Sequence, residues 1–160
     1  FFPIYLDELG YSDSIVGKIV SFSTLTAFLG TIFSPFLIKK FGLWRAFALS
    51  SLPVGITTLA TPYFDGIILL TILRLIAGVG TGIIFSSCMS SIVRGFEENY
   101  QASAMGIFQA VYAIGMLAGP ILSGIIAAKI GLESVFIISA LVSILIIFVS
   151  FSMKSEELAK

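Results

Sequence analysis

The sequence contains no histidine and only one cysteine, Cys88. Without histidine there is no Ser/His/Asp triad, no HExxH zinc motif and no His-containing metal site. A single cysteine cannot form an intrachain disulfide, and Cys88 lies inside an apolar run, where a small packing residue is expected. These absences remove the best candidates for hydrolytic chemistry. We therefore expect no metal, no cofactor and no enzymatic activity.

Charge is also scarce, because only 11% of the residues are charged, against about 25% in an ordinary soluble domain. The nine basic and nine acidic residues balance to zero net charge. No basic tract is present, which excludes nucleic acid as an expected partner. In contrast, 58% of the residues are hydrophobic and the mean hydropathy is +1.09. This composition predicts an all-α protein embedded in a lipid bilayer.

Turn residues and charges divide the chain into segments of membrane-spanning length, which is about 20 mostly apolar residues. The expected segments are the end of a first helix at 1–9 and full helices at 14–38, 43–60, 67–93, 101–128 and 133–153. The chain opens with FFPIYL, without the features of a signal peptide. We expect that it starts inside a truncated first helix. Residues 1–153 would form one transmembrane unit, and 154–160 would begin a cytoplasmic linker.

Basic residues are distributed unevenly between the predicted loops. Alternate loops hold Lys39, Lys40, Arg45, Arg94, Lys154 and Lys160, whereas the opposite side holds Lys18 and Lys129. Cytoplasmic loops of membrane proteins carry an excess of lysine and arginine. The distribution therefore predicts that the C-terminal tail is cytoplasmic.

An internal repeat appears when the chain is shifted by 89 residues against itself. Ten of the 36 positions from 17 to 52 are then identical, including Gly30 with Gly119 and Gly42 with Gly131. The shift carries the second predicted helix onto the fifth and the third onto the sixth. A step of three helices reverses direction through the membrane, so the copies are inverted. A 3+3 inverted repeat is typical of each half of many secondary transporters.

The fifth predicted helix carries a pattern of small residues, GxxxxxxxxGxxxGPxxSG. It consists of Gly106, Gly115, Gly119, Pro120, Ser123 and Gly124. Small residues allow close approach of helices in lipid, and Pro120 removes one helical hydrogen bond and favours a bend. The pattern fits a helix that moves during a conformational change. A packing seam without motion is the alternative.

This pattern resembles the fifth-helix signature of the major facilitator superfamily, which is associated with proton-coupled antiporters. Only Ser123 departs from it, because the signature usually has glycine there. In the fourth predicted helix, Arg74, Gly78 and Gly80 form RxxxGxG. That spacing is similar to the family's fourth-helix motif, in which the arginine is implicated in proton coupling. The resemblance covers essentially the whole chain and implies the N-terminal six-helix half of a twelve-helix fold.

A third family motif, GxxxDRxGRR in the loop after the second helix, is present in degraded form as PFLIKKFGLWR. Lys40 and Gly42 fit the motif, and Arg45 ends it, but Pro35 replaces the leading glycine and Lys39 replaces the aspartate. In the family, the acidic residue resembles a latch that holds the outward-open state. A lysine cannot serve as that latch, so the resemblance leaves the gating contact open.

Arg74 is the one charge well inside a predicted span, where ionisable residues are costly and tend to face a cavity or a partner. It is the first candidate for proton coupling or substrate binding. Alternatively, its guanidinium satisfies backbone carbonyls or reaches the membrane surface. Gln109 and Tyr112 on the fifth helix are further candidates. Their alternative role is an interhelical hydrogen bond.

These observations predict a secondary active transporter that moves a small solute by alternating access, with proton-coupled efflux favoured by the antiporter-like motif. Its expected partners are the lipid bilayer, a small-molecule substrate, protons and a C-terminal six-helix half. Its expected location is the cell (plasma) membrane, which it crosses several times. A nutrient symporter or uniporter of the same fold is one alternative. A membrane sensor or structural protein that does not transport is the other.

Overall fold

The structure is a computed structural model that describes the backbone of residues 1–157 and the side chains of residues 1–150. The described backbone is helical and contains no strand. The helices are α1 (Phe2–Glu8), α2 (Asp13–Phe41), α3 (Leu43–Ala60), the short 3-10 turn η1 (Thr61–Tyr63), α4 (Ile67–Gly95), α5 (Glu98–Ile130) and α6 (Leu132–Glu157). Five of them, α2 to α6, are long and apolar enough to cross a membrane. An all-helical membrane architecture is therefore confirmed.

The helices are longer than the apolar segments that predicted them. α2 continues through Lys39 and Lys40 to Phe41, and α5 begins at Glu98 and ends only at Ile130. A charged residue limits the part of a helix that lies in lipid, but it does not interrupt the backbone hydrogen bonds. For the same reason α6 continues to Glu157, so 154–157 are helical in the structure. Residues 158–160 of the predicted linker lie outside the described residues.

Two glycine turns end the helices that precede them. Gly42 separates α2 from α3 with φ 84° and ψ 160°, and Gly131 separates α5 from α6 with φ 95° and ψ 156°. This backbone conformation is open to glycine and strained for residues with a Cβ. Each glycine donates its N–H to the carbonyl four residues earlier, at 2.9 Å to Ile38 and 3.0 Å to Ala127. The two turns are therefore closely similar.

The tightest packing lies between α2 and α4. A Cβ added at Gly30 would collide with the carbonyl oxygen of Val79, and one at Gly82 would collide with the carbonyl oxygen of Ala27. Glycine at these positions lets the two backbones touch, which is the main means of helix association in lipid. α3 in turn packs against both α4 and α6. A Cβ at Gly80 would lie 2.8 Å from the carbonyl oxygen of Ser50.

Hydroxyl side chains along α3 bond to their own helix. Ser50 donates to the carbonyl of Ala46 at 2.7 Å, and Thr57 donates to the carbonyl of Pro53 at 2.7 Å. Thr61 continues the pattern with a 2.8 Å bond to the carbonyl of Thr57. Such bonds satisfy a buried hydroxyl without a partner on another helix.

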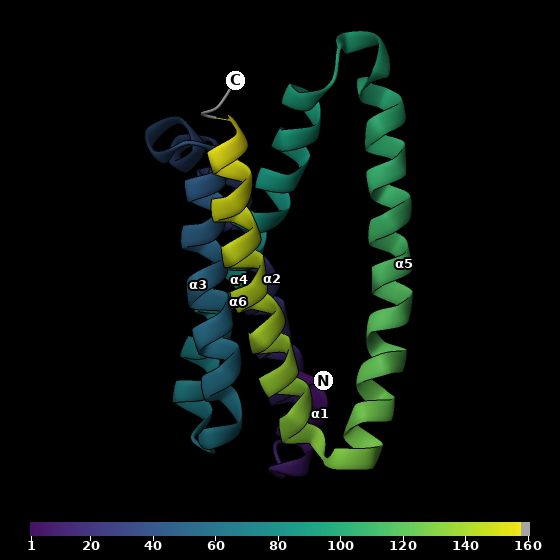
Figure 1. Cartoon of the computed structure of the whole chain (residues 1–160). Coiled ribbons are helices and arrows are strands. Elements are labelled where there is room, and N and C mark those ends of the chain that lie inside the picture. The colour runs from purple at the N-terminus through teal and green to yellow at the C-terminus, as the bar shows by residue number, and fades with distance from the viewer. Residues whose placement is uncertain (158–160) are drawn as a thin grey trace.

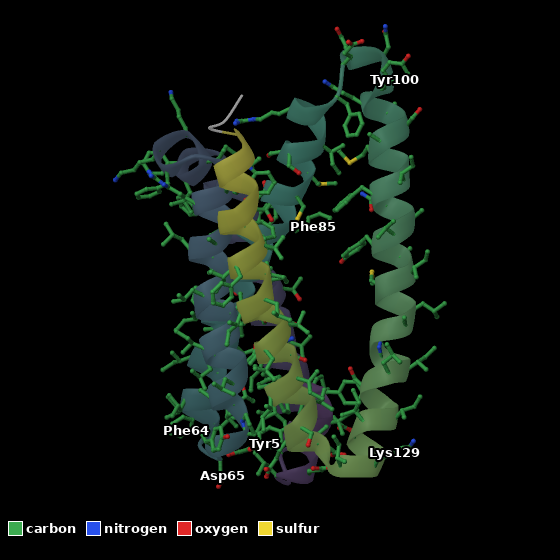
Figure 2. The ribbon with its side chains drawn as sticks, in the orientation of Figure 1. Tyr5, Phe64, Asp65, Phe85, Tyr100 and Lys129 are labelled. Carbon is green, nitrogen blue, oxygen red and sulfur yellow. The ribbon has the colours of Figure 1, made fainter. Side chains whose placement is uncertain are left out.

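We call the end of the bundle that carries Lys39, Lys40, Arg45 and Arg94 the basic end. At the opposite end, α1 packs into a buried apolar cluster formed by Phe2, Tyr5, Leu6, Ile19, Leu70 and Phe136. Two tyrosines fix the loop that precedes α4: Tyr5 donates to the carbonyl of Phe64 at 3.3 Å, and Tyr11 donates to that of Asp65 at 2.7 Å. Figure 2 shows Tyr5, Phe64 and Asp65 together at this end.

α5 differs from the other long helices because none of its residues is buried. Figure 1 shows α5 (green) standing apart from α2, α3, α4 and α6, to which it is joined by the turns at its two ends. The large apolar side chains of Ile107, Ile114 and Leu117 on α5 are all exposed. A largely exposed apolar helix is suited to lipid or to further protein.

Candidate functional site

Arg74 lies on α4, near the end of the bundle opposite the basic end, and it is partly buried. Its guanidinium carbon is 5.0 Å from the centre of the Phe2 ring on α1, a cation–π contact. The Nε atom is buried and has no hydrogen-bond partner among the described residues. Ser23 of α2 donates to the backbone carbonyl of Arg74 at 3.5 Å. The arginine thus lies where α1, α2 and α4 meet, with part of its hydrogen-bonding capacity unused.

The two glycines of the fourth-helix motif are packing positions. A Cβ at Gly78 would collide with the Oγ1 of Thr26 and lie 2.6 Å from the carbonyl oxygen of Ser23. A Cβ at Gly80 would lie 2.5 Å from the Cγ2 of Val54 on α3. These glycines hold α4 against α2 on one side and α3 on the other. They also set the position of Arg74 one turn earlier.

The fifth-helix motif has a different environment. No atom lies within 4 Å of a Cβ added at Gly106, Gly115 or Gly119, and at Gly124 the nearest is the Cζ of Phe1 at 4.0 Å. Ser123 and Gly124 are partly buried. Pro120 lies within a helix that runs unbroken from Glu98 to Ile130. Within the described part of the chain, three of the four motif glycines therefore have no neighbouring helix within reach of an added Cβ.

Gln109 and Tyr112 lie on the half of α5 nearer the basic end, and both side chains are exposed. The Tyr112 ring lies 5.4 Å from that of Phe85 on α4 and 6.3 Å from that of Phe108. Phe85 is eleven residues beyond Arg74, about 16 Å along a helix axis. The structure therefore does not bring Arg74 together with Gln109 and Tyr112.

The sequence did not predict the contact between Phe85, Phe108 and Tyr112. Phe108 and Tyr112 are four residues apart on α5, so a shared helix face could have been anticipated. Nothing in the sequence indicates that Phe85 of α4 meets them. The Phe85 and Phe108 rings are 6.2 Å apart, which completes the contact between the two helices.

The residues of the degraded loop motif lie together at the basic end. Lys39 and Lys40 are exposed in the last turn of α2, where positive charge is favoured by the helix dipole. The ammonium of Lys40 is 5.3 Å from the ring centre of Phe41. Gly42 forms the turn, and Arg45 is exposed in the first turn of α3.

An apolar cavity of about 290 Å³ lies between α3, α4 and α6 near the basic end. Trp44, Cys88 and Ile146 are among its lining residues, together with Ser87. The hydroxyl of Ser87 is buried and has no hydrogen-bond partner within the described residues. The remaining polar side chains of the lining are those of Cys88, Ser91 and Ser150.

A sequence model of the Major Facilitator Superfamily matches residues 1–159 of the chain. The chain belongs to the Major Facilitator Superfamily. This confirms the resemblance drawn from the fourth- and fifth-helix motifs. With five helices able to span a bilayer, it also identifies an integral membrane protein from a family of transport proteins, not an enzyme.

Curated relatives in this superfamily carry different names. The riboflavin transporter RibZ of Clostridioides difficile is 33% identical over 75 residues, 47% of this chain and 16% of the relative. The probable anion transporter 3 of Arabidopsis thaliana, described as chloroplastic, is 27% identical over 141 residues, 87% of this chain and 28% of the relative. The multi-drug resistance efflux pump PmrA of Streptococcus pneumoniae is 28% identical over 145 residues, 86% of this chain and 35% of the relative. The chain thus spans about a third or less of the length of these superfamily members.

Proposed function

We propose that this chain is the N-terminal six-helix half of a secondary active transporter that exports a small solute in exchange for protons by alternating access. The observation that carries the proposal is the α5 face: an apolar helix, rich in glycine, with no buried residue. Such a face suits contact with further transmembrane helices. The antiporter-like motif lies on it, and one curated relative is named as an efflux pump.

The proposed 3+3 inverted repeat is supported by the two glycine turns. Gly42 and Gly131 correspond in the 89-residue shift and have nearly the same backbone conformation and the same capping bond. By the same shift, residues 90–98 at the end of α4 fall on 1–9. The counterpart of α4 would therefore be a first helix of which α1 is the end. Just as α4 packs along α2, that helix would pack along α5.

In this proposal the protein lies in the plasma membrane and its basic end faces the cytoplasm. Cytoplasmic loops carry an excess of lysine and arginine, and the basic end holds Lys39, Lys40, Arg45 and Arg94. Arg74 would tune the charge of a proton or substrate site. Its Nε has no hydrogen-bond partner among the described residues, and its guanidinium lies over the ring of Phe2. Gln109 and Tyr112 would line the solute path. The fifth-helix glycines would form the moving interface with the second half.

The test uses the full-length protein in proteoliposomes with an imposed proton gradient. Ethidium and riboflavin serve as probes, since relatives are named as a multi-drug efflux pump and a riboflavin transporter. Arg74→Ala is expected to lower gradient-driven flux at least about tenfold, and Arg74→Lys less. Lys18→Ala removes an exposed charge from the same side of the membrane and is the matched control. Gradient-driven flux that is unchanged in Arg74→Ala would remove Arg74 from the coupling mechanism.

The alternatives give different outcomes in the same vesicles. A nutrient symporter would move its solute in the same direction as the protons, and a uniporter would ignore the proton gradient. A sensor or structural protein would show no protein-dependent flux of any probe. The degraded loop motif, with Lys39 at the position of the family's aspartate, is the observation that keeps the symporter and uniporter as candidates.

A further inference from the structure

Two shallow grooves flank α3 near the basic end of the bundle. The first, of about 390 Å³, lies between α2, α3 and α4, and its lining includes Phe41, Leu49 and Ile83. The second, of about 260 Å³, lies between α3 and α6, and its lining includes Arg45, Leu49 and Ile147. Leu49 is 59% exposed and lines both grooves. The two grooves therefore adjoin along the outer face of α3.

Both grooves are almost entirely apolar. In the first, the one hydroxyl of the lining belongs to Ser50, which donates to the carbonyl of Ala46 in its own helix at 2.7 Å. In the second, Arg45 is the only polar side chain among the described residues of the lining. A hydrocarbon chain can fill such a groove without leaving a polar group unpaired.

The grooves lie on the side of the bundle away from α5. Figure 1 shows α3 and α5 on opposite sides, with α2, α4 and α6 between them. In the proposed function, the first helix packs along α5, and the second half meets the α5 face. Both are thus placed on the far side of the bundle from the grooves. The bilayer is then the neighbour of the outer face of α3.

Each groove has a basic side chain at its end. Arg45 lines the second groove and lies one turn before Leu49 on the same face of α3. The ammonium of Lys40 is 5.3 Å from the ring centre of Phe41, which lines the first groove. Both basic side chains are exposed, and the segment 14–64 contains no acidic residue. Positive charge is therefore concentrated where the two apolar grooves reach the basic end.

This arrangement complements the charge and the shape of an anionic phospholipid. Arginine binds phosphate through paired N–H groups, and lysine binds it as a point charge. Basic residues at the cytoplasmic ends of membrane helices attract anionic lipid headgroups. A zwitterionic lipid gains less from the same residues, because it carries no net charge. Two grooves that adjoin at Leu49 offer room for two chains below one headgroup.

We propose that an anionic phospholipid binds across α3, with its phosphate between Lys40 and Arg45 and one acyl chain in each groove. The inference goes beyond the proposed function, because it concerns a lipid of the surrounding membrane and not the transported solute. It rests on the proposed function only for the position of the remaining helices and the cytoplasmic orientation of the basic end. The bound lipid contacts α2, α3, α4 and α6 at once.

The test measures lipid binding to the full-length protein by native mass spectrometry. The probes are dioleoyl-phosphatidylglycerol, which is anionic, and dioleoyl-phosphatidylcholine, which has the same chains and no net charge. One molecule of the anionic lipid should bind about tenfold more tightly than the zwitterionic lipid. Lys40→Gln and Arg45→Gln should each weaken binding of the anionic lipid roughly fivefold. Arg45→Lys keeps the charge and should weaken it less.

Arg94→Gln is the matched control, because Arg94 is exposed at the same end but is not among the residues that line the grooves. It should change the affinity for the anionic lipid less than about twofold. Equal losses in Arg94→Gln and Arg45→Gln would indicate a general attraction to positive charge. Equal affinity for the two lipids, or no bound lipid, would indicate an unselective face or one covered by another helix. Each of these results overturns the inference.

Shorter ligands separate the role of the chains from that of the phosphate. Dihexanoyl-phosphatidylglycerol has the same headgroup and should bind at least about tenfold more weakly than the dioleoyl lipid, because its chains bury less apolar area. Glycerol 3-phosphate has no acyl chain and should not displace the dioleoyl lipid. Displacement by glycerol 3-phosphate would identify a site for a free phosphate compound and would overturn the inference.

Flux measurements separate this inference from the proposed function. Selective binding of the anionic lipid that depends on Lys40 and Arg45 supports the lipid site even if ethidium and riboflavin are not transported, in which case the proposed function alone fails. Proton-driven flux of either probe, combined with no preference for the anionic lipid, overturns the inference and leaves the proposed function in place.

Discussion

α2 and α5 correspond in the 89-residue shift, and both end at a glycine with the same backbone conformation, yet their surroundings differ. α2 buries Ile19, Ser23 and Ser34 among its residues, whereas α5 buries none. A Cβ added at Gly30 would collide with the backbone of Val79, whereas no atom lies within 4 Å of a Cβ added at the corresponding Gly119. A glycine motif therefore marks where a helix can be approached closely. Whether it is approached depends on which partner helix is present.

The largest expected difference comes from placing leucine at the two corresponding glycines. Gly30→Leu should lower the free energy of unfolding by about 3 kcal/mol, because its side chain would collide with the backbone of Val79. Gly119→Leu should leave it unchanged or raise it by up to about 1 kcal/mol, since leucine favours helix and the face is open. Unfolding of this chain in mixed micelles, followed by circular dichroism, measures both. Equal losses would mean that α5 is packed after all.

The free energies of unfolding of Gly30→Leu and Gly119→Leu can also be compared in the full-length protein. If α5 meets further helices there, as proposed, Gly119→Leu should become as destabilising as Gly30→Leu. A Gly119→Leu variant that remains neutral in both contexts would contradict the proposed interface on α5.

Alanine at the two turns should produce an intermediate effect that is the same on both sides. Gly42→Ala and Gly131→Ala are each expected to cost about 1–3 kcal/mol of unfolding free energy, because φ is +84° and +95°. Gly66→Ala is the control, since Gly66 has φ −75° and open space around it. Thermal unfolding of the three variants in one detergent gives the comparison. A cost at only one of the two turns would break the correspondence between them.

The smallest expected effect concerns Ser34 and Ser123, which also correspond in the 89-residue shift. Ser34 is fully buried, and its hydroxyl has no hydrogen-bond partner within the described residues. Ser34→Ala should therefore raise the free energy of unfolding by up to about 1 kcal/mol. Ser123→Ala, on the partly exposed face of α5, should change it by less than about 0.5 kcal/mol. A loss on Ser34→Ala would indicate that the hydroxyl has a partner in lipid or water.

The number and order of helices could be predicted from the sequence because lipid requires long apolar segments, and glycine, proline and charge interrupt them. The helix ends were less predictable, since Lys39, Lys40 and Lys129 end an apolar segment without ending a helix. The open side of α5 could not be predicted. Every face of these helices is apolar, so periodicity does not separate a packed face from a lipid-exposed one.

The candidate site, too, could be predicted only in part from the sequence. The position of Arg74 inside a span follows from residue type and spacing. The packing of Gly78 against α2 and of Gly80 against α3 is seen only in the structure. The ring contact of Arg74 with Phe2 joins residues 72 positions apart, and that of Phe85 with Tyr112 joins two helices across a turn. Such contacts depend on how the helices are arranged, which no local pattern records.

The hydrogen bonds along α3 have a consequence for water. Ser50 and Thr57 lie in α3 and Thr61 follows it at the start of η1, and each donates its hydroxyl proton to the carbonyl four residues earlier. A row of hydroxyls used in this way offers a passing ion or water few free donors. These three hydroxyls therefore add polar atoms to the α3 side of the bundle without adding free donors.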